Sequence, residues 1–200
     1  VADGVVNLRG VKIIPSNAFQ YCSVIDVILP DATTIDKYAF YESTTLKSID
    51  APNVETVDRM AFSNTGLEFL ALPKVTSIPA SLCYQSKNLK YFIAGSEDYP
   101  VTYVHTGQVN STGGAPFGTC AAIKKIILCT KSGSYSGVTF SDTSLYVGST
   151  SSSSSTSFKH DSTTYMEYRT SGTYLGRNDD YDYMYNSDGA TLLKTSKDWS

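Results

Sequence analysis

The segment LKSIDAPNVETVDRMAF (residues 46–62) alternates apolar and polar residues at its start, continues through a proline, and closes on alanine and phenylalanine. The closing position recurs along the chain as Phe19, Phe40, Phe62 and Cys83, at spacings of 21, 22 and 21 residues. A constant period of this length is typical of a solenoid. Because one coil cannot bury its apolar side alone, such coils must stack on one another.

Other apolar positions keep the same register relative to this anchor. They stand five residues before it (Ile14, Ile35, Val57, Ile78), eight before it (Val11, Ala32, Val54, Val75) and eleven before it (Leu8, Leu29, Ala51, Leu72). The last column, with apolar residues two positions further upstream, predicts a short strand with one buried face. The polar-polar-Ala-Phe pattern at the anchor predicts a single helical turn. We therefore expect a β-rich α/β solenoid of about five 21–22-residue coils, each with short strands and a single-turn helix.

Residues 46–62 resemble the repeat of the BspA-type bacterial leucine-rich repeat family, whose consensus runs L-x-x-I-x-L-P-x-x-(V/L)-x-x-I-x-x-x-A-F-x-x-C-x-x-L. Residues 67–83 follow the same pattern, with Leu82 and Cys83 in place of the Ala-Phe pair. The resemblance implies a right-handed leucine-rich-repeat stack. It also implies display at a cell surface and binding to proteins of a host or a neighbouring cell.

The register breaks after Ala94. The next anchor, Phe117, comes about 12 residues later than the period requires, which predicts a protruding inserted loop within 95–115. We assign residues 1–130 to the solenoid and residues 131–200 to an irregular, β-rich C-terminal cap. The cap carries a Ser- and Tyr-rich excursion at about 149–190, in which LGRND (residues 175–179) offers the turn of a hairpin.

Charge excludes some classes of partner. Sixteen Lys and Arg residues against 19 Asp and Glu give a net charge of -3 with no basic run, which argues against electrostatic binding to nucleic acid or an anionic membrane. No apolar stretch approaches the length of a membrane span, and the chain starts at Val1 without a signal peptide. Since the resemblance implies surface display, we expect an extracellular or cell-surface protein whose signal peptide has been removed or trimmed.

The sequence offers little catalytic chemistry. It lacks the hydrolase, phosphate-loop and dinucleotide motifs, and its two histidines, His105 and His160, share no repeat column. The four cysteines have gaps of 61, 37 and 9 residues and no C-x-x-C pair, which argues against zinc. Cys22 and Cys120 stand where the family carries its cysteine, so the resemblance favours packed thiols. We expect no enzyme activity, no cofactor and no metal.

Two surfaces could bind a partner. The first is the outward stripe of the strands, read as the residues between the inward-pointing positions: Asp26, Ile28, Ser48, Asp50, Phe69, Ala71, Tyr91, Ile93, Lys125 and Ile127. Its later aromatic and aliphatic residues predict either a partner or a cover supplied by the 95–115 loop. The second surface comprises tyrosines of the loop and the excursion, with Tyr103, Tyr174, Tyr181 and Tyr183 as candidates. Its composition resembles a paratope, or it shields the terminal coil.

Three functional hypotheses follow. The preferred one is a non-catalytic extracellular recognition or adhesion module that binds a protein or cell-surface polymer through the repeat sheet and loops. The alternative is a carbohydrate-binding module, in which Tyr91, Tyr99, Tyr103 or the tyrosines of 165–185 stack on sugar rings. The third is a structural spacer of a larger surface protein. A coplanar pair of exposed tyrosines would favour carbohydrate, and a broad mixed patch would favour protein.

Overall fold

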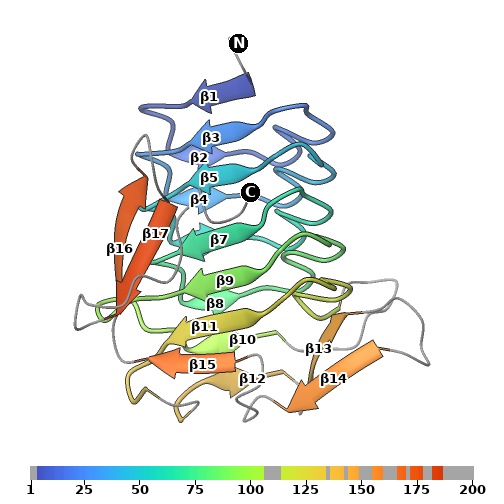
Figure 1. Ribbon diagram of the computed structural model, residues 1–200. Coiled ribbons are helices and arrows are strands. Elements are labelled where there is room, and N and C mark those ends of the chain that lie inside the picture. The colour runs from blue at the N-terminus through green and yellow to red at the C-terminus, as the bar shows by residue number, and fades with distance from the viewer. Residues whose placement is uncertain are drawn as a thin grey trace.

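The structure is a computed structural model that describes residues 4–105, 114–133 and 136–141, with the backbone of five further strands at 144–148, 155–159, 166–169, 172–177 and 182–186. Two layers of short strands run down the molecule, and the chain passes from one to the other in each coil (Figure 1). The first layer holds β1 (Val5–Asn7), β3 (Asp26–Ile28), β5 (Ser48–Asp50), β7 (Phe69–Leu72), β9 (Tyr91–Ala94) and β11 (Lys125–Cys129). The second holds β2 (Ile13–Ile14), β4 (Thr34–Ile35), β6 (Thr56–Val57), β8 (Ser77–Ile78), β10 (Tyr103–Val104) and β12 (Thr139–Phe140).

Neighbouring strands within each layer are parallel and one coil apart. Val27 of β3 faces Val6 of β1 and Ile49 of β5, and Phe92 of β9 faces Leu70 and Ile126 in the same way. The columns read from the repeat are thus the rungs of a parallel β-solenoid, which confirms that part of the predicted fold.

The core follows the anchor column. Phe40, Phe62 and Phe117 are fully buried, and the rings of Phe19, Phe40 and Phe62 stack with centroid separations of 5.1 and 5.4 Å and interplanar angles of 6° and 5°. Leucine, isoleucine and valine side chains of both layers pack around this column in one continuous cluster. Stacking of like side chains between coils therefore supplies the apolar burial that a single coil lacks.

The expected single-turn helices are absent from the described residues, which instead form successive hydrogen-bonded turns around each anchor. In the first coil the amides of Ala18, Gln20 and Cys22 donate to carbonyls three residues back, while those of Asn17, Phe19 and Tyr21 donate to the next coil. Because every second amide is used between coils, an α-helical ladder cannot form.

Backbone conformation fixes this pattern in two columns. Residues two before an anchor (Asn17, Tyr38, Met60, Ser81) and two after it (Tyr21, Glu42, Asn64, Gln85, Thr119) all have left-handed φ values between 53° and 63°. Left-handed residues interrupt a right-handed helix, so the helical part of the α/β prediction is wrong here.

Both layers are divided between the third and fourth coils. The first layer forms one sheet of β1, β3 and β5 and another that contains β7, β9 and β11; the second divides between β6 and β8. At this junction the backbones come very close, since a Cβ added to Gly66 would lie 2.3 Å from the carbonyl oxygen of Thr44. The core and the turn hydrogen bonds continue across it, for example from the amide of Phe62 to the carbonyl of Leu82.

The insertion predicted within 95–115 is divided by a strand. Val104 lies 12 residues after Phe92, whereas its counterpart Ile78 lies eight after Leu70; the remaining extra residues come between Val104 and Phe117. β10 pairs with β8 and β12, so Tyr103 belongs to the second layer rather than to a protruding loop. Residues 106–113 of this interval lie outside the described residues.

The C-terminal part is β-rich, as predicted. β13 (Ser144–Gly148) and β14 (Ser155–Lys159) form an antiparallel pair, and β15 (Met166–Arg169) adds to the first layer parallel to β11. β16 (Gly172–Arg177) and β17 (Asp182–Asn186) form an antiparallel pair around the segment where a hairpin was expected. Figure 1 shows this pair beside the ends toward which β5, β7 and β9 point.

Candidate interaction surface

The outward side of the first layer, here called the first-layer face, is polar on its early coils. Asp26 and Ile28 flank the buried Val27 on β3, and Ser48 and Asp50 lie opposite them on β5. The Ser48 hydroxyl donates to Oδ1 of Asp26 at 2.6 Å. The four residues predicted here are thus brought together, all partly exposed, by strands whose alternate residues bury Val27 and Ile49 in the core.

The later coils of the face carry aromatic and cationic side chains. Phe69 of β7 lies directly opposite Tyr91 of β9, which in turn lies opposite Lys125 of β11. All three side chains are partly exposed. The structure therefore places the predicted pair Phe69 and Tyr91 on adjacent rungs of one continuous surface.

Ile93 is not exposed, contrary to the sequence-based prediction. With Ala71 and Ile127 it forms one row across β7, β9 and β11, with exposed fractions of 0%, 3% and 1%, and Phe69 packs against this row. These side chains point away from the main core yet are buried within the single chain. Of the two alternatives, a cover from the chain itself therefore holds for Ile93.

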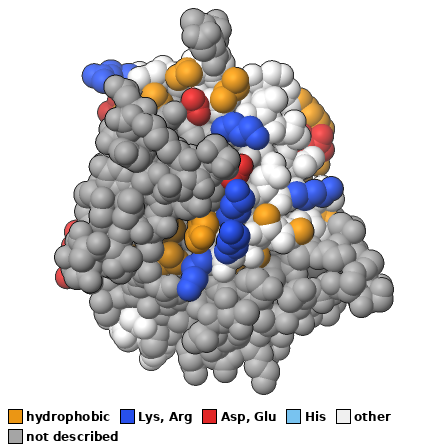
Figure 2. Space-filling view, in the orientation of Figure 1, with side chains coloured by type: hydrophobic (Ala, Val, Ile, Leu, Met, Phe, Trp, Pro, Cys, Tyr) orange, Lys and Arg blue, Asp and Glu red, His pale blue; other side chains and the backbone are white. Residues whose placement is uncertain are grey.

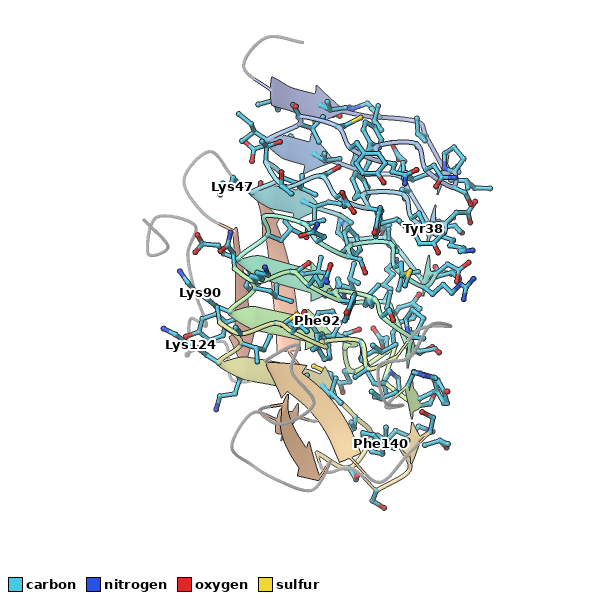
Figure 3. The ribbon with its side chains drawn as sticks, turned by 90° about the vertical axis from the view of Figure 1, so that its right-hand side faces the viewer. Tyr38, Lys47, Lys90, Phe92, Lys124 and Phe140 are labelled. Atoms are coloured by element: carbon cyan, nitrogen blue, oxygen red, sulfur yellow. The ribbon has the colours of Figure 1, made fainter. Side chains whose placement is uncertain are left out.

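A column of lysines borders the same face. The residues immediately before the strands stack from coil to coil as Ile25, Lys47, Glu68, Lys90 and Lys124. The amide of Lys47 donates to the carbonyl of Ile25, that of Lys90 to Glu68 and that of Lys124 to Lys90, at 2.7, 2.8 and 2.8 Å. Figure 3 shows Lys47, Lys90 and Lys124 in order down one side of the molecule, and basic side chains form a file at the surface in Figure 2.

The column is open to solvent and carries one described acid. Lys47 and Lys124 are exposed, and Lys90 pairs with Glu68 at 2.5 Å, with side chains that are 28% and 24% exposed. The sequence analysis missed these lysines because they lie 43 and 34 residues apart. Their shared position, one residue before each first-layer strand of the repeat, is the signal that would have found them.

Tyr103 lies apart from the first-layer face, because β10 belongs to the second layer. Its hydroxyl is 3.4 Å from Nδ1 of His105, and burial lowers the pKa of that imidazole. Tyr174 lies on β16 and Tyr183 on β17, but only the backbone of these strands is described; Tyr181 lies outside the described residues. The predicted sites are therefore not one surface.

The thiols are structural. All four cysteines are free, and the thiol of Cys120 donates to the carbonyl of Cys83 at 3.0 Å in the core. Burial raises the pKa of Cys120 to about 12 and that of Cys83 well above its ordinary value. A thiol that stays protonated is a poor nucleophile and a poor metal ligand. The packed-thiol interpretation is confirmed for these two residues.

The described residues contain no group of three or more His, Cys, Asp or Glu side chains placed to hold a metal ion. In the same part of the chain, no helix has the length and apolar character needed to cross a bilayer.

Comparisons with known proteins agree with the repeat geometry. A family model described as "BspA type Leucine rich repeat region (6 copies)" matches residues 12–146. A crystal structure of a leucine-rich repeat protein from Bacteroides ovatus is similar over 68% of each chain, at 15% sequence identity and a TM-score of 0.33. No match was found among curated proteins.

Proposed function

Because the chain belongs to the BspA-type leucine-rich repeat family, we propose that it is a non-catalytic recognition or adhesion module that binds a protein partner through the first-layer face. Leucine-rich repeats of this family suggest an interaction or surface module, and a repeat stack offers an extended, rigid surface. We further propose that the protein works outside the cell or at its surface.

The observation that carries the proposal is the mixed chemistry of the first-layer face. It joins the polar group of Asp26, Ser48 and Asp50 to the aromatic pair Phe69 and Tyr91, on strands held by the buried core. Protein contacts use such a combination, with aromatic side chains at the centre and polar side chains around them. Rungs fixed by backbone hydrogen bonds also hold these groups in place before a partner arrives.

The described tyrosines do not form a sugar-stacking platform. Tyr21 and Tyr38 both meet Tyr41 edge-on, at interplanar angles of 84° and 74°, whereas a sugar ring stacks on the flat face of an aromatic ring. On the first-layer face, Tyr91 has Phe69 and Lys125 as its neighbours along the stack. This favours protein over carbohydrate as the ligand of the described surface.

We assign recognition to residues 1–130 and capping to residues 131–200. The pairing of β15 with β11 supports this division, because an added strand covers an edge of the first layer that would otherwise present unpaired backbone groups. It also means that removing residues 149–190 would uncover β11, so point substitutions are the better test of the face.

The test is a binding screen of the full chain against purified extracellular-matrix and cell-surface proteins, with a glycan array in parallel. Tyr91→Ser probes the face, and Tyr21→Ser is its matched control, because Tyr21 is 64% exposed on a turn away from the strands. We expect a protein ligand whose affinity falls with Tyr91→Ser and holds with Tyr21→Ser. Binding to glycans alone would support the carbohydrate alternative, and silence on both panels would leave the spacer role; either overturns the proposal.

A further inference from the structure

The lysine column gives the first-layer face a charge that opposes that of the whole chain. The net charge is -3, yet Lys47, Lys90, Lys124 and Lys125 gather at one border of this face, with Glu68 between them. Parallel strands lie about 4.8 Å apart, so the backbones of Lys90 and Lys124 are separated by about 5 Å and those of Lys47 and Lys90 by about 10 Å. The fold thus builds a local cationic strip that no run in the sequence contains.

We propose that this strip, formed by Lys47, Lys90, Lys124 and Lys125, recognises an acidic polypeptide segment of the protein partner. The inference rests on the proposed function and names the chemistry of its partner. Acidic side chains would meet ammonium groups that lie at the surface, where charge complementarity speeds association and sets the register of the bound chain.

The neighbouring residues favour a polypeptide over an anionic glycan. Each member of the lysine column is followed, one residue along the strand, by a first-layer face residue: Phe69 after Glu68, Tyr91 after Lys90 and Lys125 after Lys124. A polypeptide that carries both acidic and apolar side chains can satisfy the ammonium groups and cover the aromatic pair together. A sulfated glycan lacks the apolar side chains, and the polar pair Asp26 and Ser48 already shares a hydrogen bond.

The experiment uses the full chain and a capped twelve-residue peptide of alternating Glu and Tyr as probe. A peptide with Gln in place of Glu tests the charge, and heparin tests the glycan source. The strip variant is Lys47→Gln/Lys90→Gln/Lys124→Gln. Its matched control is Arg9→Gln/Lys12→Gln/Lys131→Gln, which removes the same charge from exposed residues outside the strip.

We expect the strip variant to weaken binding of the acidic peptide about tenfold at low salt, because exposed ion pairs contribute a few tenths to one kcal/mol each. The control should stay within about twofold, and added salt should weaken binding by the wild-type chain. A thermal unfolding midpoint equal to that of the wild type shows that the strip variant is folded.

Equal losses in the two variants, or binding of heparin without binding of the acidic peptide, would overturn the inference. If a panel protein is lost with Tyr91→Ser but bound normally by the strip variant, the acidic-segment inference alone fails. Silence of the whole protein panel would instead overturn the proposed function.

Discussion

The rings of Phe40 and Phe62 lie in adjacent coils with centroids 5.4 Å apart and planes 5° from parallel, and both side chains are fully buried. The pair shows in one contact how the 22-residue spacing between the two positions becomes a rung of the core. Phe19 continues the stack one coil earlier, at 5.1 Å from Phe40.

Truncation within this stack should be costly. We expect Phe62→Ala to lower the free energy of unfolding by about 3–5 kcal/mol, because it removes a buried ring and leaves a cavity between two coils. Chemical denaturation measures the loss, with Lys87→Ala, at an exposed position, as a control that should change stability by less than about 0.5 kcal/mol. An unchanged midpoint for Phe62→Ala would refute the repeat register.

Gly66 marks the junction between the third and fourth coils. A Cβ at this position would lie 2.3 Å from the backbone oxygen of Thr44 and 3.0 Å from that of Leu46, so the backbone itself must move to accept it. We expect Gly66→Ala to destabilise by about 2 kcal/mol. Gly10→Ala is the comparison, since its added Cβ would meet nothing within 4 Å and only its left-handed backbone would be strained. A smaller effect at Gly66 than at Gly10 would contradict the close approach of the coils.

The left-handed turn columns can be tested at Met60, a partly exposed residue with a φ of 57°. Asparagine tolerates this conformation better than other non-glycine residues, whereas a β-branched side chain resists it. We expect Met60→Asn to hold or raise the thermal midpoint and Met60→Ile to lower stability by about 1–2 kcal/mol. The opposite order in differential scanning calorimetry would argue for a helical turn at this position.

The buried thiols should make the fold sensitive to alkali. Burial raises the pKa of Cys120 from 9.0 to about 12, so the folded state holds the proton more tightly than the unfolded state does. The stability this provides is complete below pH 9 and is lost as the pH rises from 9 toward 12. We expect the wild type to lose about 2 kcal/mol more than Cys120→Ala between pH 8 and pH 10.5, measured by denaturant titration. Equal losses would mean that Cys120 ionises as readily in the fold as in the unfolded chain.

The strand positions were predictable because burial depends on apolar periodicity, which the repeat displays openly. Val27, Ile49, Leu70 and Phe92 alternate with outward residues in every coil, and the structure pairs them in register. The turn conformation was not predictable in this way. Tyr38 and Met60 adopt left-handed φ values although neither is a residue type that favours them, so the strain is imposed by hydrogen bonds between coils.

The surface was predicted in part, for a related reason. The outward direction of Phe69 and Tyr91 follows from strand alternation, but the burial of Ile93 depends on a cover from outside its own repeat, which periodicity does not contain. The lysine column was missed because proximity between coils brings together residues that no linear run connects. Once the coil register is known, both the lysines and their spacing can be read from the sequence.

The most direct test of recognition through the first-layer face is to compare the affinities of the wild type, Tyr91→Ser and Tyr21→Ser for a panel protein that the full chain binds, using biolayer interferometry. We expect Tyr91→Ser to weaken binding about tenfold or more, as truncation of a central aromatic contact does. Tyr21→Ser should bind as the wild type does. Equal affinities for all three chains would place the contact elsewhere and contradict recognition through this face.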